Sequence, residues 1–80
     1  MTAREKLNGL LTEIFLLNEG ELSDELRRDD LATWDSLVTV SLGVGIEEVF
    51  GYHMSPEEAM GLDSVKDIVW LLRARGIEIE

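Results

Sequence analysis

Two serines in this chain follow an aspartate and precede an apolar residue, and their hydroxyls are the groups best placed for chemistry. The two stretches are Asp35-Ser36-Leu37 and Asp63-Ser64-Val65. A serine becomes a nucleophile when a nearby histidine, oriented by an acid, takes its proton. The only histidine is His53, and its spacing indicates no such triad, so we expect an ordinary surface residue or loop anchor. Without a base in this chain, the chemistry that remains for these serines is modification of a hydroxyl by a separate enzyme.

The two serines differ in how much of their role helix capping explains. Ser64 begins a stretch that ends in Asp67, a variant of the capping box, so we expect a structural N-cap there. At the other site Asp35 can be the N-cap, which leaves the Ser36 hydroxyl in the first helical turn without a required structural role. A phosphodiester attached to Ser36 would meet the positive end of the helix dipole. Ser36 is therefore the candidate for modification.

Other catalytic and metal-binding chemistry has no basis in the residues. The chain has no cysteine, which excludes disulfides, zinc fingers, iron–sulfur clusters and cysteine nucleophiles. The glutamate pairs 47–48 and 57–58 have no aligned histidine, so we expect them to be solvated and to bind no metal. With no acid–base constellation, we predict no catalytic residues and no enzyme.

The charge is strongly negative and unevenly distributed. The net charge is −10, and no Lys or Arg lies between Arg28 and Lys66. Nucleic acid and anionic lipid are poor partners for such a surface, whereas basic protein patches are good ones. Two interpretations remain, a solubilising surface and a docking face for basic enzymes. The acidic residues of this segment are Asp29, Asp30, Asp35, Glu47, Glu48, Glu57, Glu58 and Asp63.

The length and the N-terminus indicate one small domain. Eighty residues, 1–80, suit a single domain with a thin core. The early charges resemble no secretory signal, and no apolar stretch is long enough to span a membrane. We expect a cytoplasmic protein, which agrees with the missing disulfides. The initial Met suggests a free-standing protein, and we expect a monomer.

Apolar periodicity predicts two long helices in the first half of the chain. The first is expected from Thr2 to Leu17, with a capping box at its start and stops at Asn18 and Gly20. A polar connection, 18–34, follows; its leucines 22, 26 and 31 should pack on the core, and a helical turn is expected at 24–27. The second helix should run from residue 35 or 36 to 50–51.

Two features of the second helix leave its details open. Leu42, Ile46, Val49 and Phe50 are expected on one face, and Leu37, Val40 and Val44 on an adjacent one. Residues 37–40 also have β propensity, so a strand is the alternative. Gly43 and Gly45 each cost about 1 kcal/mol in a helix, and we expect them to loosen it, to let another backbone approach closely or simply to be tolerated.

The second half of the chain predicts a short helix and a long one. Ser55, Pro56 and Glu58 form a helix start, and Gly61 ends that helix. The last helix should run from about Asp63 to residue 74 or 75, followed by a tail. Three long helices and one short helix predict an all-α four-helix bundle with a long first loop. That loop should let the first two helices run in the same general direction.

These features together resemble the acyl carrier protein family over nearly the whole chain. The resemblance rests on Asp35-Ser36-Leu37, on the ending Glu47-Glu48-Val49-Phe50-Gly51 of the same helix, and on the order and spacing of the helices. It implies that a phosphopantetheinyl transferase attaches 4′-phosphopantetheine to Ser36. The thiol of this arm would hold an acyl group as a thioester. Ser64 lies too near the C-terminus to match the family's site.

The resemblance also implies partner and cargo surfaces. Enzymes that load and transfer acyl groups would use their own basic patches to dock on the second helix of this chain. The expected contacts are Asp35, beside the arm, and Leu37, Val40, Glu47 and Glu48. The residues expected to line an acyl-chain cavity are Leu42, Ile46, Phe50, Leu62 and Ile68.

The chain departs from the family pattern near the serine. Thr33 and Trp34 stand where Gly and Leu are frequent, and Val38 and Ser41 stand where acids are frequent. This favours a dedicated carrier in a specialised lipid, polyketide or secondary-metabolite pathway over one for general fatty-acid synthesis. The alternatives are an aminoacyl or peptidyl carrier of the same fold, and an unmodified interaction domain that binds through Val38, Val40 and Val44.

Overall fold

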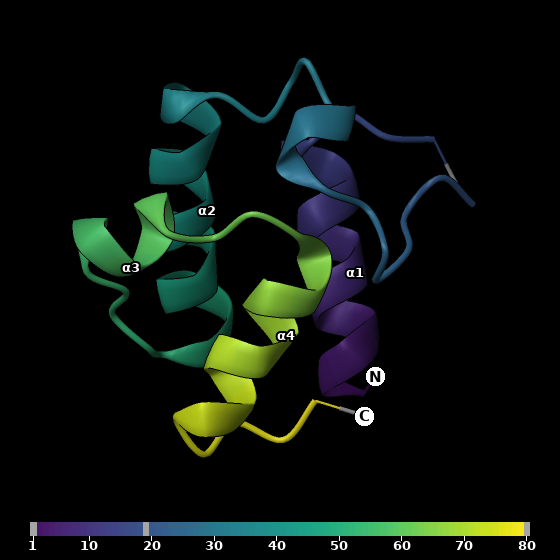
Figure 1. Cartoon of the computed structure of the whole chain (residues 1–80). Helices are drawn as coiled ribbons and strands as arrows, with labels where there is room; N and C mark the ends of the chain where they lie inside the picture. The colour runs from purple at the N-terminus through teal and green to yellow at the C-terminus, as the bar shows by residue number, and fades with distance from the viewer. Residues whose placement is uncertain (1, 19, 80) are drawn as a thin grey trace.

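The computed structural model describes residues 2–18 and 20–79, and within them the chain is all-helical. The predicted all-α bundle is confirmed, and the strand alternative for residues 37–40 is wrong (Figure 1). A single turn of 3₁₀ helix, Arg28–Asp30, lies in the long first connection. The four α-helices are α1 (Ala3–Ile14), α2 (Ser36–Phe50), α3 (Pro56–Met60) and α4 (Val65–Ala74).

Helix α1 has its predicted start but ends three residues earlier than expected. The Thr2 hydroxyl accepts the N–H of Glu5, and the Glu5 carboxylate accepts the N–H of Thr2, which confirms the capping box. At the other end Leu16 takes a left-handed conformation with φ of 56°. The N–H groups of Leu16 and Leu17 then bond to the carbonyls of residues 13 and 12. This is a Schellman ending, usually built on glycine, which explains why sequence reasoning placed the stop later.

The long connection doubles back and pairs with the start of α4. Arg27 and Ser64 form an antiparallel bridge, and the carbonyls of Asp24 and Leu26 accept the N–H groups of residues 66 and 65. A single hydrogen-bonded turn, from the Leu26 N–H to the Ser23 carbonyl at 3.1 Å, lies within the range predicted for a helical turn, 24–27. The extended backbone at Arg27 ends it there, and the 3₁₀ helix forms at 28–30. The three leucines of the loop, 22, 26 and 31, pack half-buried against the core as predicted.

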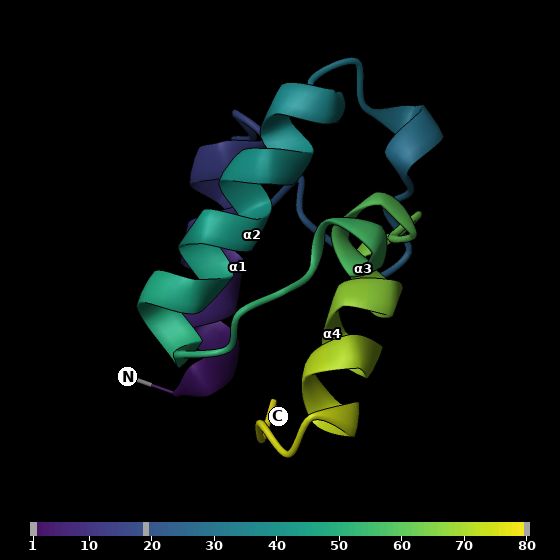
Figure 2. The same cartoon turned by 90° about the vertical axis from the view of Figure 1, so that its left-hand side faces the viewer.

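This doubling back also sets the direction of the helices. Figures 1 and 2 both show α1 running one way along the bundle and α2 returning the other way, so the predicted common direction is wrong. The connection between α1 and α2 does not run from one end of the bundle to the other. It returns to the end at which α1 finishes, and α2 starts from there.

The core is apolar and draws on every α-helix. In α2 the buried residues are Thr39, Leu42 and Ile46, while Phe50 is half-buried and Val49 is exposed. Val49 therefore does not belong to the buried face on which we expected it. The core residues are Leu7, Leu11, Phe15, Trp34, Leu42, Ile46, Met54, Ala59, Leu62, Val65, Ile68, Val69, Leu72 and Ile79.

The two glycines inside α2 have different surroundings. A Cβ added at Gly43 meets no atom within 4 Å, whereas one added at Gly45 lies 2.6 Å from Cδ1 of Leu10. Gly45 therefore admits the Leu10 side chain of α1, where the sequence interpretation held that another backbone approaches. Gly43 faces open space and has no such neighbour.

Replacing Gly43 with Ala is expected to stabilise the protein by about 1 kcal/mol, because Ala is the better helix former. Gly45→Ala should gain less, because the Leu10 side chain has to move to admit the new methyl group. Urea denaturation of both variants measures the difference. Equal stabilisation by the two changes would contradict the packing described for Gly45.

Candidate functional site

The Ser36 hydroxyl stands exposed at the first residue of α2. Asp35 is the N-cap, as predicted: its Oδ1 accepts the N–H of Val38 at 3.0 Å. The Asp35 carbonyl accepts both the N–H and the hydroxyl of Thr39 at 2.9 Å. The Ser36 hydroxyl has no hydrogen-bond partner among the described residues, so it has no structural duty there. Ser36 is free for a reaction with an external group.

The segment before Ser36 is fixed to the end of α1 by residues that sequence reasoning treated only as departures. Trp34 is buried, 3% exposed, and its ring stacks on Phe15 with centroids 4.6 Å apart. The Thr33 hydroxyl donates to the Phe15 carbonyl at 2.8 Å. These contacts position Asp35 and the start of α2. In the sequence, the large aromatic residue Trp34 directly before the N-cap was the feature that could have indicated this anchor.

Ser64, the rival serine, is the N-cap of α4. Its hydroxyl accepts the N–H of Asp67 at 3.1 Å, and the Asp67 carboxylate accepts the N–H of Asp63 at 3.1 Å. Helix α4 therefore begins at Val65, two residues later than expected, since residues 63 and 64 are occupied by the cap and the bridge. The cap and the burial of Ser64 confirm its structural role.

The residues predicted to contact partners all lie on the surface of α2. Leu37 is 79% exposed and Val40 is 65% exposed, and Glu47 and Glu48 are exposed in the last turn of the helix. Val44 is exposed between them. The outer face of α2 is thus apolar over its first turns and acidic only near its end. Whether enzymes dock on this face stays a prediction.

A hollow of about 250 Å³ lies between α2 and the segment that contains α3. The five residues predicted to line an acyl-chain cavity do not line it. Leu42, Ile46, Leu62 and Ile68 are buried in the core and Phe50 is half-buried, so their cavity role stays a prediction. The lining is mainly apolar and comprises Thr39, Val40, Gly43, Val44, Glu47, His53, Met54, Pro56, Ala59 and Met60.

Sequence reasoning missed this hollow because it depends on how α2 packs against the loop and helix that follow it. Gly43 was the one local signal, since a glycine within an apolar helix leaves space beside it. At one end of the hollow, His53 Nδ1 lies 3.3 Å from Glu47 Oε2, and both side chains are largely exposed. His53 is therefore a surface residue, as expected. Within residues 2–18 and 20–79, no cluster of His, Asp or Glu could hold a metal ion.

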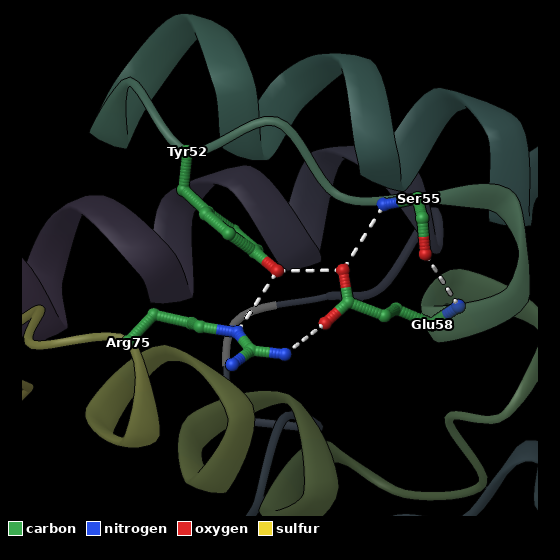
Figure 3. Close-up of polar contacts among 4 residues, drawn as sticks. All are labelled: Tyr52, Ser55, Glu58 and Arg75. Carbon is green, nitrogen blue, oxygen red and sulfur yellow. Dashed lines mark hydrogen bonds and ion pairs between the residues drawn. The ribbon is translucent and has the colours of Figure 1, made fainter.

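A polar clasp joins the α2–α3 loop, α3 and the end of α4 (Figure 3). Glu58 Oε1 accepts the Tyr52 hydroxyl at 2.6 Å and the N–H of Ser55 at 3.1 Å. Its Oε2 accepts Nη2 of Arg75 at 2.6 Å, and Arg75 Nε donates to the Tyr52 oxygen at 3.1 Å. The Arg75 guanidinium also lies 5.9 Å from the centre of the Tyr52 ring. Three segments thus meet on one carboxylate.

The clasp stabilises the ionised form of Glu58. The hydrogen bond from Arg75 contributes most, followed by those from Tyr52 and Ser55, and together they lower the pKa of Glu58 from 4.5 to about 2. The bond to Glu58 in turn raises the pKa of Arg75. Both charges are therefore present at neutral pH and in mild acid.

Glu58→Gln is expected to weaken the protein at pH 7 and to flatten its acid sensitivity. A carboxylate with a lowered folded-state pKa contributes stability above its unfolded pKa, near 4.5, and loses it as the pH falls through about 2. Urea denaturation at several pH values between 7 and 2 measures this. Glu57→Gln on the same helix removes the same charge outside the clasp and is the control. Parallel curves for the wild type and Glu58→Gln would contradict the prediction.

The site and the fold together define a class of protein: a small helical bundle that presents an exposed serine hydroxyl at a helix start. No family model matches the chain. An acyl carrier protein of Coprothermobacter proteolyticus is 29% identical over 70 residues, which cover 88% of this chain and 85% of that relative. This similarity confirms the resemblance to the acyl carrier protein family.

The same similarity bears on the general role of the chain. The name of that relative denotes a carrier and not an enzyme, which supports a carrier role and agrees with the prediction of no enzyme. No helix in the described ranges is long and apolar enough to cross a membrane.

Proposed function

We propose that this chain, as a single domain, is a discrete acyl carrier protein that holds its cargo as a thioester on 4′-phosphopantetheine at Ser36. The observation that carries the proposal is the exposed Ser36 hydroxyl, freed because Asp35 caps the helix. The similarity to an acyl carrier protein over most of the chain supports it.

The start of α2 suits a phosphodiester. The first N–H groups of a helix have no partner within it, and Asp35 occupies only those of Val38 and Thr39. The N–H groups of Ser36 and Leu37 remain for phosphate oxygens, aided by the helix dipole. In the attachment step the Ser36 oxygen bonds to the coenzyme A phosphorus that carries the pantetheine arm. The bond from that phosphorus to the bridging oxygen of the diphosphate breaks, adenosine 3′,5′-bisphosphate leaves, and a base of the transferase takes the hydroxyl proton.

The outer face of α2 is the proposed docking surface for the transferase and for acyl-loading and acyl-transferring enzymes. No acid lies on α2 between Asp35 and Glu47, and the exposed residues there include Leu37, Val40 and Val44. A partner would need an apolar patch beside Ser36 and a basic patch facing Glu47. This mixed surface favours dedicated enzymes of a specialised lipid, polyketide or secondary-metabolite pathway. We propose a cytoplasmic, monomeric carrier.

The hollow between α2 and α3 is the proposed shelter for the apolar part of the cargo. Thr39 begins its lining, three residues after Ser36 on the same helix, and Glu47 ends it. Eight helical residues separate these two, a distance of about 12 Å along the axis. A chain attached near Ser36 could therefore lie along α2 within the hollow.

A thiol titration tests the proposal, because the chain contains no cysteine. The purified protein is incubated with coenzyme A and a phosphopantetheinyl transferase, and small molecules are then removed. We expect about one thiol per chain by reaction with a disulfide reagent, and none without the transferase. A chain that gains no thiol with several transferases would contradict the proposal.

A further inference from the structure

The hollow between α2 and α3 has two walls, one formed by a single long helix and the other by a loop and a short helix. The α2 wall is part of a fifteen-residue helix that is anchored in the core. The opposite wall is built from the α2–α3 loop and from α3, which has only five residues. A helix this short has little stability of its own. Other contacts must therefore hold the second wall in place.

Two kinds of contact hold that wall. Met54 and Ala59 are buried in the core and anchor it from the inside. On the outside, Glu58 bonds to Arg75, the C-cap residue of α4, so the clasp ties α3 to a longer helix. Figure 3 shows the Tyr52 hydroxyl and the Arg75 guanidinium converging on the Glu58 carboxylate. Tyr52 and Ser55 bracket His53 and Met54, both of which line the hollow.

We propose that Arg75 is a positioning residue that, through Glu58 and Tyr52, holds α3 at the distance from α2 that keeps the hollow formed. Arg75 does not line the hollow and acts only through the wall. The clasp itself is independent of the arm. Its consequence for cargo rests on the proposed function, in which the hollow shelters the apolar part of the acyl group.

Arg75→Met tests the wall directly in the unmodified protein. The change removes the guanidinium and leaves the Ser55–Glu58 capping box intact. Amide hydrogen exchange, followed by NMR, reports on the bonds from Ala59 N–H to the Ser55 carbonyl and from Gly61 N–H to the Glu57 carbonyl. We expect exchange at these amides to rise about threefold, a size typical of a partly exposed ion pair.

Arg73→Met is the matched control for this measurement. Arg73 lies on the same helix, but its guanidinium donates two hydrogen bonds to the Ile79 carbonyl at 2.8 and 2.9 Å and none to α3. We expect no change in α3 exchange for this variant. Equal exchange in the two variants would overturn the proposal.

Binding of the uncharged fluorophore 1-N-phenylnaphthylamine tests the hollow itself. A preformed site binds more tightly than one that must be assembled, so Arg75→Met should weaken binding about threefold and Arg73→Met should not. Gly43→Leu, which fills the hollow from α2, should abolish binding and locate the probe. Looser α3 amides with unchanged probe affinity would overturn the link between clasp and hollow.

These measurements separate the two proposals. Exchange and probe binding use the protein without an arm, so they test the clasp even if no transferase modifies Ser36. Conversely, a chain that gains its thiol but shows identical Arg75→Met and wild-type behaviour is a carrier whose hollow does not depend on the clasp.

Discussion

Replacing Ser36 with Ala is expected to abolish attachment of the phosphopantetheine arm completely. The hydroxyl oxygen is the atom that would bond to phosphorus, and alanine has no atom to replace it. The change should leave stability within about 0.5 kcal/mol, because Ser36 is exposed and its hydroxyl has no partner among the described residues. Intact mass after co-expression with a transferase measures attachment, and urea denaturation confirms that the variant is folded.

Ser64→Ala is the matched control, since both serines follow an aspartate at the start of a helix. The Ser64 hydroxyl caps α4, so the change should cost about 1 kcal/mol of stability and leave attachment intact. The two serines should therefore show opposite phenotypes, one losing the arm and the other losing stability. A mass increase that survives Ser36→Ala, or disappears in Ser64→Ala, would refute the assignment of the site.

Replacing Trp34 with Ala is expected to lower the free energy of unfolding by about 3–5 kcal/mol. Trp34 is fully packed, stacks on Phe15 and ties the start of α2 to the end of α1. A small domain has only about 5–15 kcal/mol of stability, so this loss is a large share of the whole. Urea denaturation followed by circular dichroism measures it. The variant should also accept the arm more slowly, because the segment before Ser36 loses its anchor.

Two further variants show whether burial causes this loss. Trp70 is 72% exposed on α4, so Trp70→Ala should change stability by less than about 0.5 kcal/mol. Trp34→Phe keeps the ring contact with Phe15 and removes the Trp34 Nε1–H, which has no partner among the described residues. Its cost should therefore be clearly smaller than that of Trp34→Ala. A similar loss for Trp34→Ala and Trp70→Ala would contradict the packing of Trp34.

Local features of the chain predicted most of the helix starts. Thr2 with Glu5 and Ser55 with Glu58 form reciprocal capping boxes in the structure, and Asp35 caps α2. A cap depends on residues three positions apart, so its geometry follows from the order of the residues alone. The prediction that Ser64 caps a helix and that the Ser36 hydroxyl is free has the same local basis.

Most errors arose where distant segments decide the conformation, and the early end of α1 is the local exception. The early end of α1 depends on a leucine in a left-handed turn, a conformation that periodicity does not indicate. The late start of α4 comes from the bridge between Arg27 and Ser64. The exposure of Val49 and the antiparallel course of α1 and α2 likewise depend on how the helices pack.

The helices, most of their caps and the choice of Ser36 over Ser64 could be predicted from the order of the residues, because they depend on contacts a few positions apart. How Ser36 is held and what surrounds it follow from the packing of the folded chain. The stacking of Trp34 on Phe15 and the clasp from Arg75 to Glu58 join residues 19 and 17 positions apart, and the hollow forms where residues 39–47 of α2 face residues 53–60. Chain closure over such distances is decided by the packing of the whole core, which no local pattern contains.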